Sequence, residues 1–231
     1  MKAIILAGGL GTRLKSLLSN MPKPMAPING QPFLAILLQH LKEQGIQEVI
    51  IAVGYLKDAI ITYFGNNYLD MKITYSMEQS PLGTGGAIFQ ALKNIEDNEN
   101  VLILNGDTFC PIIYGQFLKY YMHHKANFAI VLKQENNIDR YGKVEINEKG
   151  EVIDFLNTKD GKKGLINCGI YLLNKSVFKD FTLPNKFSFE IDFLQKYIKD
   201  INLLAYKVDN YFIDIGVPED YQSFCNIRNG I

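Results

Sequence analysis

The sequence predicts an α/β protein of three layers, in which a mainly parallel sheet lies between helices. Two observations predict this class: short apolar runs typical of buried strands alternate with segments of helical period, and turn residues separate them. A chain of 231 residues is long enough for one such domain and too short for two ordinary ones. We therefore expect a single domain over residues 1–231.

The first half of the chain predicts the parallel strands and their connecting helices. Residues 2–7 form a continuous apolar run that ends in glycines, as a strand buried on both faces does. From Phe33 the apolar residues recur with helical spacing until Gly45. The alternation continues with strands expected at 49–53, 73–76 and 101–104, and helices expected at 58–64 and after Gly86. The ligand crevice of such a sheet lies at the carboxyl ends of its strands.

The second half predicts antiparallel strands. Segments 143–146 and 151–155 flank the turn sequence NEKG and predict a β-hairpin. Two further strands are expected at 165–173 and 203–208. We expect these strands to form a small antiparallel lid over one side of the crevice, followed by a closing helix that begins at Pro218.

Composition limits the partners and the location of the protein. Twenty-four basic residues balance twenty-four acidic ones, so no overall field would attract nucleic acid or a membrane surface. The apolar start at residues 3–7 is too short for a signal-peptide core or a membrane span. The three cysteines have no metal-ligand spacing and are odd in number, which is typical of a reducing cytosol. We expect a cytoplasmic protein that binds neither nucleic acid nor membranes and uses its cysteines as small core residues.

A glycine-containing loop follows the first strand, where residues 8–13 read GGLGTR. Glycines there let backbone N–H groups approach an anion closely, and Arg13 adds a guanidinium suited to phosphate oxygens. The loop lacks the third glycine of the dinucleotide pattern and the Gly-Lys-Ser/Thr of the P-loop pattern. Taken alone, the alternative interpretation is a glycine-rich turn with a surface arginine.

A single cation stands between two prolines in the segment Pro22-Lys23-Pro24. The prolines fix the backbone on either side of the ammonium group. A cation held in this way can meet a developing negative charge without reorganising. Taken alone, a loop lysine between turn prolines is the simpler interpretation.

Together these two segments resemble a known family. Residues 8–14 (GGLGTRL) followed by residues 22–25 (PKPM) closely resemble the signature of the sugar nucleotidyltransferases, the pyrophosphorylases that make nucleotide sugars. The resemblance continues in residues 78–87 (EQSPLGTGGA), 104–107 (LNGD) and 212–221 (FIDIGVPEDY), and so covers nearly the whole chain. It implies a Rossmann-like sheet of the nucleotidyltransferase and glycosyltransferase-A type.

The resemblance also implies the catalytic residues. In the family the first loop, its arginine and the lysine embrace the triphosphate and stabilise departing pyrophosphate, which implies these roles for Arg13 and Lys23. Asp107 and Asp214 match the family's two carboxylates and would together hold Mg²⁺, a cation that prefers carboxylate and phosphate oxygens. The nucleophile is already an anionic phosphate oxygen, so no general base and no histidine is required. One departure is Ser16, where the family commonly has a loop-shaping proline.

The binding residues implied by the family fall into two groups. Those expected to bind nucleotide are Leu6, Ala7, Gly8, Gly9, Gly11, Thr12, Arg13, Glu78, Pro81, Gly83 and Thr84. Those expected to bind the sugar phosphate are Asn105, Gly106, Tyr141, Gly142, Lys159, Asn167, Gly169 and Glu190. The family often has a Glu-Lys pair that meets the sugar phosphate, whereas this chain has Asn157-Thr158 at that place. Lys159, Lys162 and Lys163 are the candidate substitutes.

The sequence also indicates which nucleotide base and which sugar the protein uses. The Glu78 carboxylate can accept hydrogen bonds from the N1–H and amino group of guanine, which uracil and thymine lack, and this favours GTP. Residues 12–16 and 22–28 look most like the D-glycero-α-D-manno-heptose 1-phosphate guanylyltransferases, which make GDP-heptose for bacterial surface polysaccharides. The sequence shows no hexapeptide repeat, so we expect no β-helix acyltransferase domain within it.

Two alternatives to a heptose-specific enzyme stay open at this point. One is a hexose- or N-acetylmuramate-1-phosphate transferase that uses UTP, dTTP or GTP. The other is a non-catalytic nucleotide-sugar-binding subunit, although such a protein would be expected to have lost Lys23 or one of the two aspartates. The partners expected are the nucleoside triphosphate and the sugar 1-phosphate, and a homodimer is compatible with this interpretation.

Overall fold

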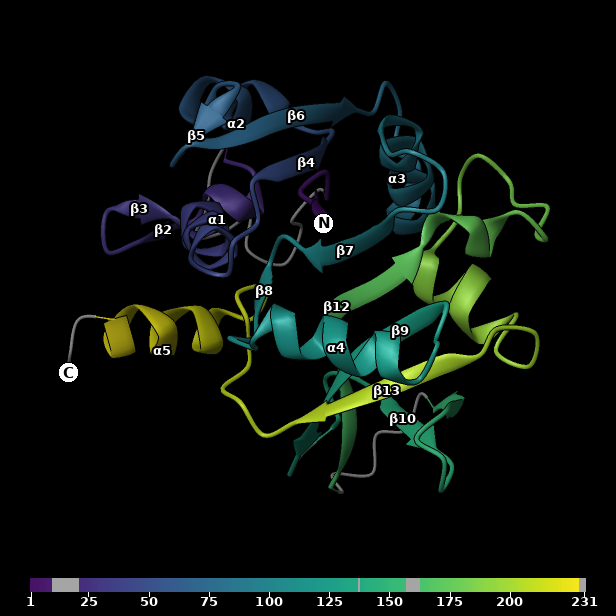
Figure 1. Ribbon diagram of the computed structural model, residues 1–231. Coiled ribbons are helices and arrows are strands. Elements are labelled where there is room, and N and C mark those ends of the chain that lie inside the picture. Colours follow the sequence, from purple (N-terminus) through teal and green to yellow (C-terminus); the bar gives the residue numbers. More distant parts are fainter. Residues whose placement is uncertain (10–20, 137, 157–162, 229–231) are drawn as a thin grey trace.

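Ten strands form one central sheet in the computed structural model, which describes residues 1–9, 21–136, 138–156 and 163–228 (Figure 1). Their order is β11-β10-β12-β7-β1-β4-β6-β5, with β9 beside β12 and β13 beside β9. The strands are β1 (Lys2–Leu6), β4 (Glu48–Val53), β5 (Asn67–Tyr68), β6 (Met71–Met77), β7 (Asn100–Asn105), β9 (Phe128–Glu135), β10 (Lys143–Ile146), β11 (Val152–Leu156), β12 (Gly164–Asn174) and β13 (Leu203–Val208).

Four neighbouring strands at the centre of this sheet, β7, β1, β4 and β6, are parallel. They are the strands that the apolar runs of the first half predict, and the α/β class is confirmed. The end of β1 is in register with the ends of its two neighbours, since Leu6 pairs with Ala52 of β4 and with Asn105 of β7. The residues that follow these strands therefore share one edge of the sheet.

Helices cover both faces of the sheet and complete three layers. Alternate residues of β1 divide between two core clusters: Ile5 packs on the face covered by α1, α2, α4 and α5, and Ile4 on the face covered by α3. The helices are α1 (Phe33–Glu43), α2 (Lys57–Phe64), α3 (Gly83–Ala91), α4 (Tyr114–His123) and α5 (Pro218–Arg228). The closing helix begins at Pro218, as predicted, and α3 begins at Gly83 rather than after Gly86.

The strands expected at 165–173 and 203–208 are not part of a lid. The first is β12, which pairs antiparallel with β7 and with β9, and the second is β13, which pairs parallel with β9. The reason is two-sided burial: Leu172 of β12 packs in one core cluster, and its neighbour Tyr171 packs in the other. A long apolar strand of this kind extends a central sheet, since a lid strand would keep one polar face.

The predicted hairpin is present as β10 and β11, which pair antiparallel around the turn at 147–150. It joins the sheet where Val144 pairs with Leu165 of β12. This hairpin is the part of the expected small antiparallel element that the structure contains. Strand β9 and helix α4 have no counterpart among the expected segments.

Two short ladders lie outside the central sheet. Strand β8 (Thr108–Phe109) pairs antiparallel with β14 (Ile213–Asp214), and β2 (Pro27–Ile28) pairs with β3 (Gln31–Pro32). Figure 1 shows β2 and β3 beside α5, where the Tyr221 hydroxyl donates to the carbonyl oxygen of Pro27 at 2.6 Å. The first ladder joins the segment after β7 to the segment before α5, two segments on which the site depends.

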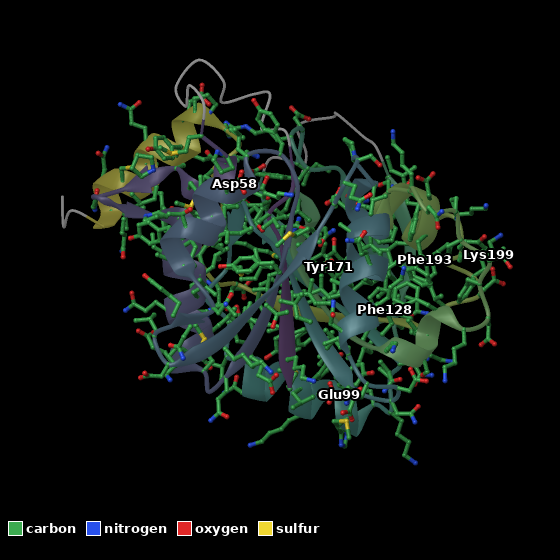
Figure 2. All side chains as sticks on the ribbon, turned by 90° about the horizontal axis from the view of Figure 1, so that it is seen from above. Asp58, Glu99, Phe128, Tyr171, Phe193 and Lys199 are labelled. Atoms are coloured by element: carbon green, nitrogen blue, oxygen red, sulfur yellow. The ribbon has the colours of Figure 1, made fainter. Side chains whose placement is uncertain are left out.

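An aromatic cluster attaches the π-helix η5 (Phe189–Gln195) to the sheet. The rings of Phe189 and Phe193 stack with centroids 5.8 Å apart, and Tyr171 meets Phe189 edge-on at 5.1 Å. Phe128 of β9 lies 6.3 Å from Phe193. Figure 2 labels Tyr171 near the middle of the molecule, with Phe128 and Phe193 towards one side. The cluster holds in place the helix that carries Glu190.

The cysteines lie where small core residues are expected. Cys110 and Cys168 are buried free thiols, as expected for core residues, and Cys225 is half-buried. Within the described ranges, no helix combines the length and the apolar character that crossing a membrane requires.

Candidate functional site

A cavity of about 610 Å³ opens at the carboxyl ends of the parallel strands. Each of β1, β4, β6 and β7 contributes its last residue or the residues that follow it. The lining residues are Leu6, Ala7, Gly8, Gly9, Lys23, Pro24, Gly54, Tyr55, Glu78, Gln79, Ser80, Pro81, Gly83, Thr84, Ala87, Asn105 and Asp107. The structure therefore brings together all the described residues that the sequence predicts to bind nucleotide.

Gly11, Thr12 and Arg13 lie outside the described residues, as does the sugar-side Lys159. Their predicted roles stay predictions.

Lys23 connects the cavity to both predicted metal ligands. It opens the short helix η2 (Lys23–Met25), and its side chain is only 9% exposed. The ammonium Nζ donates to Asp107 Oδ2 at 2.6 Å and lies 3.8 Å from Asp214 Oδ1. A buried ammonium needs such partners because burying an unpaired charge is costly. The three predicted catalytic residues that the structure describes thus form one cluster.

The short β8–β14 ladder explains how two distant aspartates meet. Asp214 pairs with Thr108, the residue after Asp107. In addition, the backbone N–H of Ile215 donates to the carbonyl oxygen of Asp107 at 3.0 Å, and that of Gly216 donates to Asp214 Oδ1 at 2.7 Å. These bonds hold the Asp107 and Asp214 segments together, and of the two aspartates Asp107 lines the cavity.

This pair of carboxylates suits a hard divalent cation. Mg²⁺ is usually held by one or two protein carboxylates, with waters and substrate phosphates completing its octahedral shell. No group of three or more His, Cys, Asp or Glu side chains that could hold a metal occurs among the residues that the structure describes. Asp107 and Asp214 fit magnesium held jointly with a nucleotide better than a metal held by protein groups alone.

Glu78 directs its carboxylate into the cavity from the end of β6. Its Oε2 accepts a hydrogen bond from the backbone N–H of Leu82 at 2.9 Å. Its Oε1 lies so close to Gly8 that a Cβ atom there would be 2.6 Å away. Burial raises the pKa of the Glu78 carboxyl, and the Leu82 N–H acts in the opposite direction. A Cβ atom at position 8 would therefore force the Glu78 carboxylate to move.

The glycines at the start of α3 also have a packing role. A Cβ on Gly83 would lie 2.5 Å from the carbonyl oxygen of Phe187, and one on Gly85 would lie 2.1 Å from the Phe187 ring. The Thr84 hydroxyl accepts from the backbone N–H of Phe189 at 2.9 Å. The start of α3, which is predicted to bind nucleotide, is therefore packed directly against the segment that leads into η5.

Among the residues predicted to bind the sugar, Asn167 is the centre of a polar group. Its side-chain Nδ2 donates to Tyr171 Oη at 2.7 Å and to Glu190 Oε1 at 3.1 Å, while its Oδ1 accepts from the backbone N–H of Gly169 at 2.9 Å. Gly169 has a φ of +69°, and a Cβ there would lie 2.4 Å from Asn105 Nδ2. Four of the predicted sugar residues, Asn105, Asn167, Gly169 and Glu190, are thus neighbours.

Tyr141 and Gly142 line a second cavity of about 550 Å³, to which Glu190 also contributes. There the Tyr141 hydroxyl donates to Asp220 Oδ2 at 3.2 Å, and Arg140 Nη1 lies 3.1 Å from Asp220 Oδ1. Of the predicted sugar residues, Asn105 lines the first cavity, and Tyr141, Gly142 and Glu190 line the second. Asn167 and Gly169 line neither, and the Asn167–Glu190 hydrogen bond connects their group to the second cavity. Gly106 lines neither cavity; its N–H donates to the carbonyl oxygen of Leu6 at 2.9 Å.

Comparison with known proteins identifies the family of this site. A family model described as nucleotidyl transferase matches residues 2–227. The chain belongs to the nucleotidyl transferase family.

Among the nucleotidyl transferases, several relatives match over nearly the whole chain. The D-glycero-alpha-D-manno-heptose 1-phosphate guanylyltransferase of Campylobacter jejuni subsp. jejuni is 51% identical over 224 residues, covering 97% of this chain and 98% of that protein. The enzyme of the same name from Aneurinibacillus thermoaerophilus is 45% identical over 222 residues, covering 96% of each chain. The crystal structure of HddC from Yersinia pseudotuberculosis complexed with GMP-PN has a TM-score of 0.87 and 38% identity, covering 98% of this chain and 99% of that one.

Some residues of this nucleotidyl transferase site are not among those predicted from the sequence. Gly54 and Tyr55 line the first cavity because they follow β4 at the same edge of the sheet. Asp220 holds Tyr141 in the loop before β10, and Phe187 packs against the start of α3. The strand-end rule applied to β4 would have found the first two, whereas the sequence carries no local signal for the contacts of Asp220 and Phe187.

Proposed function

We propose that the protein transfers a guanylyl group from GTP to D-glycero-α-D-manno-heptose 1-phosphate, which yields GDP-heptose and pyrophosphate. The observation that carries this proposal is the first cavity, whose lining includes Lys23, Asp107 and Glu78. The relatives that share about half of this sequence are named for this reaction.

Glu78 is the proposed determinant of the base. A carboxylate offers only acceptors, and guanine presents two adjacent donors, its N1–H and its amino group. The bond from Leu82 N–H to Oε2 fixes the direction of the carboxylate while leaving Oε1 and further lone pairs for the base. This arrangement favours guanine over uracil and thymine.

Lys23, Asp107 and Asp214 are the proposed catalytic residues, with Arg13 expected to join them. The ammonium of Lys23 is suited to neutralise charge that develops on the phosphates when the bond to pyrophosphate breaks. The two aspartates would hold Mg²⁺, which when bound neutralises charge on the α-phosphate and aligns the two substrates. The attacking phosphate oxygen is already an anion, so these residues need not remove a proton.

Asn105, Asn167, Gly169 and Glu190 are proposed to bind the sugar, with Tyr141 and Gly142 beside them. Amide and carboxylate groups of this kind exchange hydrogen bonds with sugar hydroxyls. The Asn167 amide is held by three protein partners, so it is already oriented. A polar group of this rigidity favours one arrangement of hydroxyls over others.

The test is a matrix of substrates. The purified protein is incubated with Mg²⁺, one of GTP, ATP, UTP or dTTP, and one 1-phosphate of heptose, mannose, glucose or N-acetylmuramic acid, and pyrophosphate release is measured. We expect the highest kcat/KM for GTP with heptose 1-phosphate. Equal rates with UTP or dTTP would contradict the base assignment, and a preference for a hexose would contradict the sugar.

A variant separates loss of catalysis from loss of folding. Asp107→Asn should lose pyrophosphate release while its circular dichroism and thermal midpoint stay close to those of the parent protein. Turnover at the parent rate in this variant would eliminate the proposed metal site. Absence of turnover with every substrate pair in the parent protein would favour a non-catalytic binding subunit instead.

A further inference from the structure

The Lys23 ammonium lies between the carboxylates that are the proposed metal ligands. Its Nζ is 2.6 Å from Asp107 Oδ2 and 3.8 Å from Asp214 Oδ1, and its side chain is more deeply buried than either aspartate. The cluster therefore contains one positive charge shared by two negative ones. Any other cation that uses the same oxygens has to compete with this ammonium.

Gly216 provides the space in which the ammonium lies. A Cβ atom at this position would be 2.2 Å from Lys23 Nζ and 2.9 Å from Lys23 Cε. It would also be 2.7 Å from Asp214 Oδ1, which the Gly216 N–H itself contacts. Because real Cβ atoms essentially never approach so closely, a glycine is required for the ammonium to take this place.

The side chain of Lys23 can move away from the two carboxylates, whereas its backbone is fixed. Its backbone is braced by Pro22 and Pro24, whose φ angles are fixed by their rings. The four-carbon stem of lysine has rotatable bonds that can carry the ammonium elsewhere in the same cavity. Gly8 and Gly9, which are expected to bind the triphosphate, line the same cavity as Lys23.

We propose that Lys23 is the resident cation of the Asp107–Asp214 pair and that a divalent metal takes these carboxylates by displacing it towards the nucleotide phosphates. The inference rests on the proposed function, because it needs a metal and a triphosphate in this cavity. Gly216 is the positioning residue that makes the resident state sterically possible. The triphosphate supplies a new anionic partner for the released ammonium, so metal and nucleotide bind cooperatively, each raising the affinity for the other.

The exchange predicts that removal of the Lys23 charge strengthens metal binding, whereas damage to an active site ordinarily weakens it. Mn²⁺ binding, measured by the loss of the free-ion electron paramagnetic resonance signal, should be at least about tenfold tighter in Lys23→Gln than in the parent protein without nucleotide, equivalent to about 1.4 kcal/mol. With a non-hydrolysable GTP analogue present, this advantage should shrink or reverse, because the parent lysine then contacts phosphate. Affinity in Lys23→Gln that is equal to or weaker than in the parent protein overturns the proposal.

A matched control removes the same charge at the opposite end of β1. Lys2 Nζ pairs with Glu99 Oε2 at 3.4 Å, and Lys2→Gln should leave Mn²⁺ affinity unchanged. If Lys2→Gln raises the Mn²⁺ affinity over the parent protein as much as Lys23→Gln does, the effect is one of net charge and the proposal fails.

A second measurement covers the case in which Lys23→Gln folds poorly. The variant leaves two neighbouring carboxylates without their ammonium, so we expect its thermal midpoint to fall. Saturating Mg²⁺ should then raise the midpoint more in the variant than in the parent protein, because a ligand that binds only the folded state stabilises it. An equal or smaller rise overturns the exchange. Neither measurement uses turnover, so failure of the exchange and failure of the proposed reaction are separate results.

Discussion

Glu78 illustrates how a single residue acquires its proposed role from its surroundings. Its carboxylate is fixed by the Leu82 N–H, and it faces the cavity from the end of β6. Burial raises the pKa of the Glu78 carboxyl. Because this pKa lies above the unfolded value, its contribution to stability is present at low pH and is lost as pH rises through the folded pKa. The ionised form of Glu78 is the one suited to guanine. Because its pKa is raised, Glu78 ionises at a higher pH than an ordinary glutamate does.

Glu78→Gln should raise the KM for GTP by about ten- to a hundredfold, since a hydrogen bond to a charged group contributes more than a neutral one. In the parent protein the KM for GTP should also rise as the pH falls through the raised pKa of Glu78. The variant should lack this acid limb. Steady-state kinetics as a function of pH check both expectations, and an acid limb that persists unchanged in the variant would assign it to another group.

Gly169 is required by its backbone conformation and by its neighbour. Its φ is +69°, a region that costs other residues roughly 1–2 kcal/mol, and its missing Cβ leaves room for the Asn105 side chain. Gly169→Ala should therefore lower the free energy of unfolding by at least about 1–2 kcal/mol and raise the KM for the sugar phosphate. Urea denaturation and kinetics measure the two effects.

Gly115 serves as the control for this substitution. It lies in α4 with no atom within 4 Å of an added Cβ. Gly115→Ala should raise stability by about 0.5–1 kcal/mol, because alanine is the better helix former. If Gly169→Ala behaves like Gly115→Ala, the strain at Gly169 is not significant.

At the level of the secondary-structure elements, α3 and η5 form a connected pair. Gly85 N–H donates to the carbonyl oxygen of Phe187 at 3.0 Å, and the Thr84 hydroxyl accepts from Phe189 N–H. The first element contributes to the proposed nucleotide site, and the second carries Glu190 of the proposed sugar site. Their contact explains why α3 begins with glycines, although the sequence predicted this helix only after Gly86.

Thr84→Val should remove the hydrogen bond to Phe189 while keeping the shape of the side chain. We expect a loss of about 1 kcal/mol in the free energy of unfolding and a several-fold rise in the KM for the sugar phosphate, because η5 loses an anchor at its first residue. Thr84→Ser keeps the hydroxyl and should retain both values. Valine and serine variants that behave alike would show that the hydroxyl has no such role.

Elements were predicted well where their pattern was local. The helix from Phe33 and the strand at 203–208 follow from apolar spacing and lie where expected. Strand β9 was missed although its residues 128–132 read FAIVL, a run of the kind used to find the other buried strands. The lid was misassigned because periodicity shows that β12 is buried and does not show which strands it pairs with.

At the scale of the whole molecule, Asp220 joins distant parts of the chain. It lies in the first turn of α5, which follows the Asp214 segment, and it holds both Arg140 and Tyr141. The loop before the hairpin is thereby tied to the segment that carries a proposed metal ligand. The Tyr141 ring also meets Phe212 edge-on at 5.5 Å, which strengthens the same junction.

Asp220→Asn should affect the sugar side more than stability. Partly exposed ion pairs are worth about 0–1 kcal/mol, so the free energy of unfolding should change by less than about 1 kcal/mol. The KM for the sugar phosphate should rise several-fold, with kcat and the KM for GTP little changed. Glu219→Gln removes the same charge from the neighbouring exposed residue and should leave all three values unchanged. A fall in kcat alone for Asp220→Asn would place its role elsewhere.

Sequence alone was sufficient for the family, the α/β class and most of the residues that line the first cavity. The reason is that strand ends, glycine loops and the proline-braced lysine are local patterns, and parallel strands bring such ends to one edge of a sheet. Only the three-dimensional arrangement revealed that Lys23 lies between Asp107 and Asp214 and that β12 and β13 belong to the central sheet. Those facts depend on which strands pair and on the space left by Gly216, and pairing between segments far apart in a chain leaves no mark in the spacing of its residues.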